Sequence, residues 1–172
     1  AALLAPSVNA APLVDVVAVQ RPELIAAMAD AVRAAVAQLD VREPTVRKTV
    51  EHFSTFFAQA PALLAFTLRP YQALIDQGLG EDTSAEQINR LRGQPDLLSV
   101  GAAVQNTLLA ATALGYGSCW LSGPLVARDA LESLLGIAAP QRLATLVAVG
   151  KQASAPKPRA AVELAGRYRV LG

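Results

Sequence analysis

The fold of this chain is decided by the stretch SVGAAVQNTLLAATALGYGSCWLSGP, residues 99–124. Its apolar first part predicts a helix over Leu98–Leu114 that ends at Gly115, a residue suited to the position just after a helix. The next residues predict a strand over Ser118–Leu121, and the glycine and proline after it predict a tight turn. The stretch therefore indicates a helix, a strand and a turn in direct succession.

The same stretch carries no charged residue from Leu97 to Ala127. A helix this apolar is expected to be covered on nearly all sides, with partners for the buried amides of Gln105 and Asn106. These amides, the glycine break that follows the helix, and Pro124 divide the run into pieces shorter than the about 20 residues that a bilayer requires. We therefore expect no membrane span.

The length of 172 residues predicts one domain over residues 1–172. Hydrophobic residues make up 53% of the chain and charged residues 17%, which predicts a large core, or a core plus a buried interface with a partner. The net charge of +1, the lack of a basic run and the 5% aromatic content argue against nucleic-acid binding. The single cysteine, Cys119, excludes an internal disulfide and is compatible with a reducing compartment.

Apolar spacing and turn residues predict the other elements. Helices and strands alternate along the chain, which predicts an α+β domain with a mixed central sheet flanked by helices. The continuous apolar run Pro61–Leu68 suits a buried central strand. The more polar segment 71–95 is expected to form a lid-like excursion, and residues 156–172 a C-terminal arm. The remaining predicted strands are Val14–Val19 and Leu143–Val149. The remaining predicted helices run from Pro22 to Leu39, over about Thr45–Phe57, near Ser84–Leu91, where Ser84 can cap, and over Leu125–Leu135, which Gly136 closes.

Side chains suited to acid–base or nucleophilic chemistry are few. His52, the only histidine, is interpreted as a surface residue, because no second histidine or cysteine cluster accompanies it. Cys119 is expected to pack inside its strand, because no histidine is placed to activate it. The glycines of Gly115-Tyr-Gly117 are not a dinucleotide fingerprint, since a helix precedes them and a strand follows. We expect no catalytic side chain and no metal site, so an enzyme of this kind would need a cofactor.

Three separated motifs resemble those of the nitroreductase family, whose members carry FMN and pass electrons from NAD(P)H to small acceptors. The first is Ala5-Pro6-Ser7-Val8-Asn9-Ala10-Ala11-Pro12, which resembles the family's Ala-Pro-Ser-x-x-Asn-x-x-Pro loop but is one residue shorter. The resemblance implies that Pro6, Ser7 and Asn9 reach the flavin of the partner subunit. The alternative is an ordinary turn built on asparagine and serine.

The second motif is the stretch 99–124 with the helix after it, which resembles the family's helix–strand–turn–helix core. The resemblance implies that Leu121, Ser122 and Gly123 contact the flavin ring, with the backbone N–H of Ser122 or Gly123 facing N5. A main-chain donor there would stabilise the reduced, electron-rich ring, and glycine would allow a close approach. The alternative is a plain strand-to-helix turn in which Pro124 opens the helix.

The third motif is Val147-Ala-Val-Gly150 followed by Pro156-Lys157-Pro158-Arg159. The resemblance implies that Lys157 and Arg159 bind the FMN phosphate, where lysine supplies a point charge and arginine a bidentate fork. The alternative is a solvated basic tail. The family usually opens with a helix that carries Arg-Arg-Ser-x-Arg, which would lie before Ala1 and has no counterpart within residues 1–172.

The resemblance implies an FMN-dependent oxidoreductase that moves hydride from NAD(P)H through flavin N5 to a nitroaromatic, a quinone or a similar conjugated acceptor. It further implies an intertwined cytoplasmic homodimer with flavin sites at the interface and an acceptor choice set by the segment 71–95. Arg47 and Lys48 are weak candidates for contact with the far side of the ring. The alternatives are a flavin-binding or degenerate dimer without turnover, and a flavin-destroying or dehalogenating enzyme of the same fold.

Overall fold

The structure is a computed structural model that describes residues 1–80, 82–154, 160–161, 166–167 and 169–170. The strands of this part of the chain form one antiparallel sheet in the order β1-β2-β4-β3, so that β1 and β3 lie at its edges. The strands are β1 (Val14–Val19), β2 (Ala62–Leu68), β3 (Gly117–Leu121) and β4 (Arg142–Gly150). The predicted central position of the second strand is confirmed.

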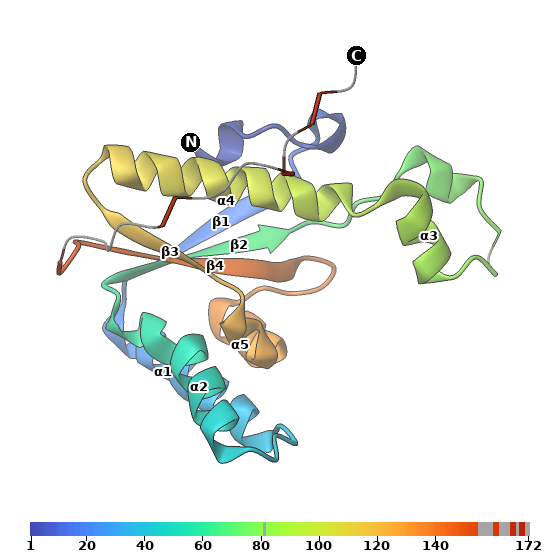
Figure 1. Ribbon diagram of the computed structural model, residues 1–172. Helices are drawn as coiled ribbons and strands as arrows, with labels where there is room; N and C mark the ends of the chain where they lie inside the picture. The colour runs from blue at the N-terminus through green and yellow to red at the C-terminus, as the bar shows by residue number, and fades with distance from the viewer. Residues whose placement is uncertain (81, 155–159, 162–165, 168, 171–172) are drawn as a thin grey trace.

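Helices cover both faces of the sheet, as Figure 1 shows. One face carries α1 (Pro22–Gln38), α2 (Pro44–Thr55) and α5 (Arg128–Leu135), and the other face carries α4 (Pro95–Ala113). The expected α+β architecture with helices flanking one sheet is therefore confirmed, although the sheet of the described residues is antiparallel rather than mixed. None of the helices in the described residues has both the length and the apolarity needed to cross a membrane.

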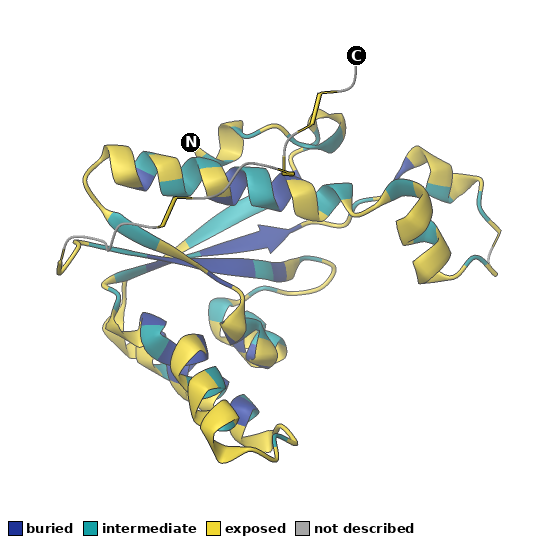
Figure 2. Ribbon diagram, in the orientation of Figure 1, coloured by how far each residue is buried: buried dark blue, intermediate teal, exposed yellow. Residues whose placement is uncertain are grey.

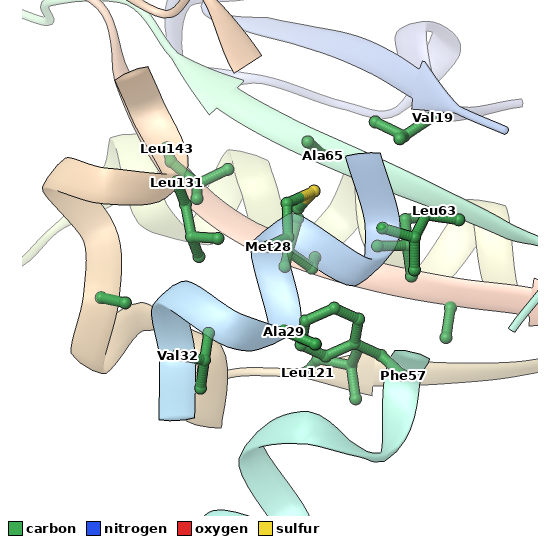
Figure 3. Close-up of a cluster of buried hydrophobic side chains, with 14 of the residues drawn as sticks. Val19, Met28, Ala29, Val32, Phe57, Leu63, Ala65, Leu121, Leu131 and Leu143 are labelled. Carbon is green, nitrogen blue, oxygen red and sulfur yellow. The ribbon is translucent and has the colours of Figure 1, made fainter. Parts of the chain in front are cut away.

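The larger hydrophobic core lies between the sheet and the α1 layer (Figure 3). Met28 and Val32 of α1 are four residues apart, so both point from one face of the helix toward the sheet. They pack with Phe57, Leu63 and Leu131, and all five side chains are fully buried. Each such burial contributes about 1.5–3 kcal/mol relative to exposure, which fixes the α1 layer on this face.

A second, smaller core lies between the sheet and α4. Val100 and Val104 of α4 are buried against Phe66 and Leu68 of β2 and Val147 of β4. Both faces of the central strands therefore pack against helices, which explains their continuous apolar sequences.

The prediction that α4 is covered on nearly all sides is wrong for the single chain. Its outward face is exposed (Figure 2), with Leu98 at 74%, Leu109 at 59% and Leu114 at 72% exposure. Gln105 is also exposed, and the Asn106 side chain makes a long contact of 3.5 Å from Nδ2 to the Ala1 carbonyl. Among the described residues, the face of α4 that carries Val100 and Val104 packs on the sheet, and the outward face is left without cover.

Helix ends follow the glycines that the sequence singles out. Gly115 (φ 75°) follows α4 and Gly136 (φ 68°) ends α5, both in the left-handed region that glycine adopts without strain. The predicted helix Leu125–Leu135 begins later than expected, because a short 3-10 turn, η5 (Gly123–Ala127), precedes α5. Similarly, α2 ends at Thr55 and continues as the 3-10 turn η3 (Phe56–Gln59).

The segment 71–95 projects from the body of the molecule (Figure 1). It contains the 3-10 turn η4 (Leu74–Gln77) and α3 (Ala85–Arg92), which Ser84 caps as predicted. Arg92 Nε lies 2.9 Å from Asp76 Oδ1, and the guanidinium lies 5.6 Å from the Tyr71 ring centroid. The half-buried ion pair thus joins η4 to α3 within the excursion.

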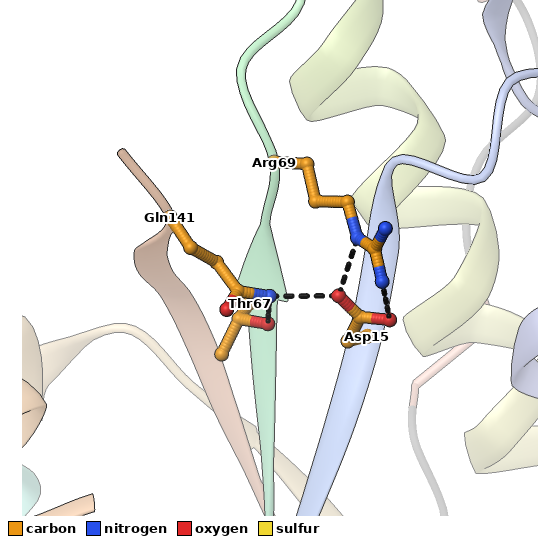
Figure 4. Close-up of polar contacts among 4 residues, drawn as sticks. All are labelled: Asp15, Thr67, Arg69 and Gln141. Atoms are coloured by element: carbon orange, nitrogen blue, oxygen red, sulfur yellow. Dashed lines mark hydrogen bonds and ion pairs between the residues drawn. The ribbon is translucent and has the colours of Figure 1, made fainter. Parts of the chain in front are cut away.

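A polar cluster joins the β1–β2 pair to the residue before β4 (Figure 4). Arg69 donates two hydrogen bonds to Asp15, at 2.7 and 2.9 Å, and Gln141 Nε2 donates to Asp15 at 2.7 Å and to Thr67 Oγ1 at 2.6 Å. The hydrogen bonds from Arg69 stabilise the carboxylate and hold the pKa of Asp15 below its usual value, against a smaller opposing effect of burial.

Candidate functional site

The turn that follows β3 lies directly on the last turn of α2. Ser122 and Gly123 are both exposed to solvent. A Cβ atom added to Gly123 would lie 2.8 Å from Ser54 Oγ and 3.2 Å from Ser54 Cα. The close packing of α2 therefore requires glycine at position 123. The sequence does not reveal this reason, because the resemblance implies that Gly123 allows a close approach of the flavin instead. The contact fixes the turn and the end of α2 relative to each other.

A cavity of about 690 Å³, which we call the turn cavity, opens over this turn. It gathers two of the chain's four phenylalanines and its only tryptophan, together with main-chain groups of the turn. Such a cavity suits a planar aromatic ligand that also needs hydrogen bonds from backbone amides. Its lining residues are His52, Phe53, Phe56, Gln59, Cys119, Trp120, Leu121, Ser122 and Gly123.

A buried threonine holds the strand that ends at the turn. Trp120 Nε1 donates to Thr145 Oγ1 at 2.8 Å, and Thr145 Oγ1 donates to the Leu121 carbonyl at 2.7 Å. Thr145 thus ties two consecutive residues of β3 to β4 through one hydroxyl. Sequence reasoning missed this residue, whose only signal is a polar side chain inside an apolar strand.

Two residues for which the sequence predicts no catalytic role, His52 and Cys119, line the turn cavity. His52 is exposed, as predicted, but it lines the turn cavity together with Ser122 and Gly123. Cys119 is also exposed, so the prediction that it packs inside its strand is wrong. Its strand lies at the edge of the sheet and has a neighbour on one side only, which leaves the cysteine uncovered.

A second cavity of about 300 Å³, the lysine cavity, continues from the turn cavity along β3. Both cavities share Phe56, Gln59 and Cys119, and the lysine cavity extends to Lys151. Lys151 Nζ lies 4.4 Å from the Tyr116 ring centroid, a cation–π contact that holds a positive charge at this end.

The basic residues predicted for this region are only partly described. Lys157 and Arg159 lie outside the described residues. Arg47 donates hydrogen bonds to the backbone carbonyls of Ala37, Leu39 and Val41, at 2.8, 3.1 and 2.9 Å, and it lines neither the turn cavity nor the lysine cavity. Lys48 lines neither the turn cavity nor the lysine cavity.

The Pro6–Pro12 loop lies on the α4 side of the molecule. Ser7 Oγ donates to the Ala11 carbonyl at 2.8 Å, and the Val8 amide donates to Ser99 Oγ of α4 at 3.0 Å. Asn9 is exposed and has a positive φ of 54°, which asparagine tolerates better than most residues. Pro6 is exposed as well. Within one chain, therefore, the structure does not bring this loop to the turn cavity.

Metal ligation finds no support in this part of the chain. Across the described residues, no group of three or more histidine, cysteine, aspartate or glutamate side chains could hold a metal ion.

Comparison with known proteins identifies the class. A model of the nitroreductase family matches residues 1–151, so the chain belongs to the nitroreductase family, as the three motifs predict. A BluB-like flavoprotein from Clostridium difficile is 26% identical and superposes with a TM-score of 0.84, over 99% of this chain and 85% of that chain.

Two further structures share the fold. A nitroreductase with bound FMN from Bacteroides fragilis is 22% identical, with a TM-score of 0.71 over 99% of this chain and 82% of its own. A nitroreductase with bound FMN from Desulfitobacterium hafniense is 19% identical, with a TM-score of 0.72 and the same coverage. The predicted nitroreductase-like fold is confirmed.

Proposed function

We propose that this chain is an FMN-dependent oxidoreductase that moves hydride from NAD(P)H through the flavin to a nitroaromatic, a quinone or a similar conjugated acceptor. The observation that carries the proposal is the turn cavity, which is lined both by aromatic side chains and by the exposed turn at Ser122 and Gly123. The chain that contains this cavity belongs to the nitroreductase family. FMN supplies the hydride chemistry when bound, so the enzyme needs no conventional acid–base or nucleophilic arrangement of side chains.

The residues of the turn cavity fit a flavin ring. Its volume of about 690 Å³ lies within the range usual for small-molecule sites. Phe53, Phe56 and Trp120 provide apolar surface that excludes water. In our proposal the amides of Ser122 and Gly123 donate hydrogen bonds to the ring and stabilise negative charge on it.

We propose that Lys157 and Arg159 bind the phosphate group of FMN. The described part of the chain offers support, because the lysine cavity continues from the turn cavity toward Lys151, from which the chain leads to these two residues. Arg159→Ala should weaken FMN binding about tenfold or more, since a charge-assisted pair contributes about 1.5–3 kcal/mol. Riboflavin, which lacks the phosphate, should bind almost unchanged; equal losses for both ligands would refute the assignment.

We further propose that the active form is a homodimer in which the Pro6–Pro12 loop of one subunit completes the site of the other. Support comes from the placement of this loop away from the turn cavity of its own chain. The exposed leucines of α4 and an apolar cavity of about 470 Å³ beside them, which includes Leu3, Leu114 and Tyr116, provide the surface that a second copy would cover.

The decisive experiment is a visible absorption spectrum of the protein reconstituted with FMN and then treated with NADH or NADPH without air. We expect a stoichiometric yellow complex whose flavin absorption bleaches with either nicotinamide and returns when a quinone is added. A yellow protein that does not bleach would instead indicate a flavin-binding protein without turnover. A protein that binds no FMN would indicate a degenerate dimer and refute the proposal.

A further inference from the structure

His52 is the one basic side chain that the structure places on the wall of the turn cavity. It lies in the last turn of α2, and its ring contacts Phe53 edge-on, with centroids 5.2 Å apart and an interplanar angle of 74°. The contact between Gly123 and Ser54, two residues further along α2, holds the histidine and the Ser122–Gly123 turn on the same cavity.

The residues that line the turn cavity beside His52 carry no formal charge. Among the residues that line the turn cavity, Cys119 of β3 is the only other titratable group, and the lining residues of η3 and η5 carry no charge. On α2 itself, Glu51 is the adjacent residue and Lys48 lies one turn earlier. Among the described residues that line this cavity, a protonated His52 would therefore be the only positive charge offered to a ligand.

We propose that His52 contacts the flavin and, when protonated, favours its reduced form. The inference rests on the proposed function of the turn cavity. Reduction increases the negative charge of the flavin, and the main-chain amides of the turn offer only neutral donors. A cation that lines the same cavity strengthens this stabilisation by its attraction to the negative charge. Imidazole is the side chain that gains or loses its charge near neutral pH, so the effect depends on pH.

The test compares His52→Gln with the unaltered protein, since glutamine keeps hydrogen-bonding groups but cannot be charged. Lys48→Gln is the matched control, because it removes a charge from the same helix outside the cavity. For each protein, FMN affinity is measured by fluorescence quenching, and the midpoint potential of the bound flavin by equilibration with a reference dye. Both are measured at about pH 6 and about pH 8.5, on either side of the usual imidazole titration.

At the lower pH, His52→Gln should lose about tenfold in its preference for reduced over oxidised FMN, which lowers the potential of a two-electron couple by about 30 mV. At the higher pH the two potentials should coincide, and Lys48→Gln should match the unaltered protein throughout. The inference would be overturned if His52→Gln and the unaltered protein had equal flavin potentials at both pH values, or if His52→Gln lowered the potential equally at both. Either result would leave the proposed function intact. Failure of the unaltered protein to bind FMN would overturn both.

Discussion

At the scale of single residues, Gly123 shows how a site can depend on an absent side chain. Any other residue at this position would place its Cβ only 3.2 Å from Ser54 Cα, and that neighbour is helix backbone, which cannot move aside as a flexible side chain would. The turn, the helix end and the cavity between them thus form one packed unit.

Gly123→Ala should therefore destabilise the fold by about 1–3 kcal/mol, the usual cost of overpacking. The measurement is the free energy of unfolding from urea denaturation. Gly80→Ala is the control, because a Cβ there would meet nothing within 4 Å. Equal stability of the two variants would show that α2 does not pack closely enough on the turn to require glycine at position 123.

Ser122→Ala tests the neighbouring residue. The change removes the hydroxyl but keeps the backbone N–H, so in our proposal NADPH oxidation should stay within roughly threefold of the original rate. Rapid-mixing absorbance measures this step directly. Loss of flavin reduction with FMN still bound would assign the chemistry to the hydroxyl instead.

At the scale of elements, β3 is an edge strand whose position depends on few contacts. Its neighbour β4 holds it by the ladder and by the hydroxyl of Thr145, which serves both Trp120 and Leu121. A strand with one neighbour has fewer restraints than a central one, so each side-chain contact contributes more to its position.

Thr145→Val should lower stability by about 1–3 kcal/mol, because it leaves the buried partners of one hydroxyl without a hydrogen bond. It should also weaken FMN binding several-fold. The fluorescence of Trp120, the only tryptophan, reports the change directly. Thr145→Ser, which keeps the hydroxyl, should behave nearly as the original; a loss as large as that of Thr145→Val would show that the hydroxyl alone does not hold the strand.

The Asp15–Arg69 pair should make the β1–β2 pairing sensitive to acid. Because the pKa of Asp15 is lower in the folded than in the unfolded state, the pair stabilises the fold above the unfolded value of about 3.9. This stabilisation is lost as the pH falls through the folded pKa. The stability difference between the original and Asp15→Asn should therefore be constant from neutral pH to about pH 5 and shrink below about pH 4.

Denaturation curves measured across this pH range test the prediction. Arg69→Gln should give the same pH profile as Asp15→Asn, because it removes the other half of the pair. About 1 M salt should reduce the difference, since both side chains are partly exposed. A difference that persists unchanged at the lowest pH would contradict the role of the ionised carboxylate.

The elements were predictable from sequence where local patterns decide them. The strand Val14–Val19, the capping by Ser84 and the stops at Gly115 and Gly136 follow from spacing and from glycine's conformational freedom. The exposure of Cys119 on the edge strand β3 was not predictable, because the position of a strand within the sheet depends on pairing between distant segments.

The site was predictable only where a motif marks it. The sequence pattern pointed to the turn at Ser122 and Gly123, but neither Thr145 nor the cavity wall formed by His52 belongs to a contiguous motif. These residues reach the turn through the packing of α2 and β4, which one sequence does not encode in any local pattern.

At the scale of the whole molecule, the uncovered face of α4 predicts a stable dimer that buries more than about 2,000 Å². Light scattering after size exclusion should give twice the chain mass down to low concentration. Leu109→Lys, on the exposed face of α4, should shift the equilibrium toward monomer, while Leu74→Lys, exposed at 81% on the projecting segment, should not. A stable folded monomer of the original chain would refute the dimer.

The separation of the Pro6–Pro12 loop from the turn cavity has a genetic consequence. If each site draws its loop from one subunit and its turn from the other, two different inactive variants can repair each other. Co-expression of an Asn9→Ala chain with a Gly123→Ala chain should yield mixed pairs in which one site has both parts intact. Random pairing would then restore about a quarter of the original sites, a complementation that neither variant achieves alone.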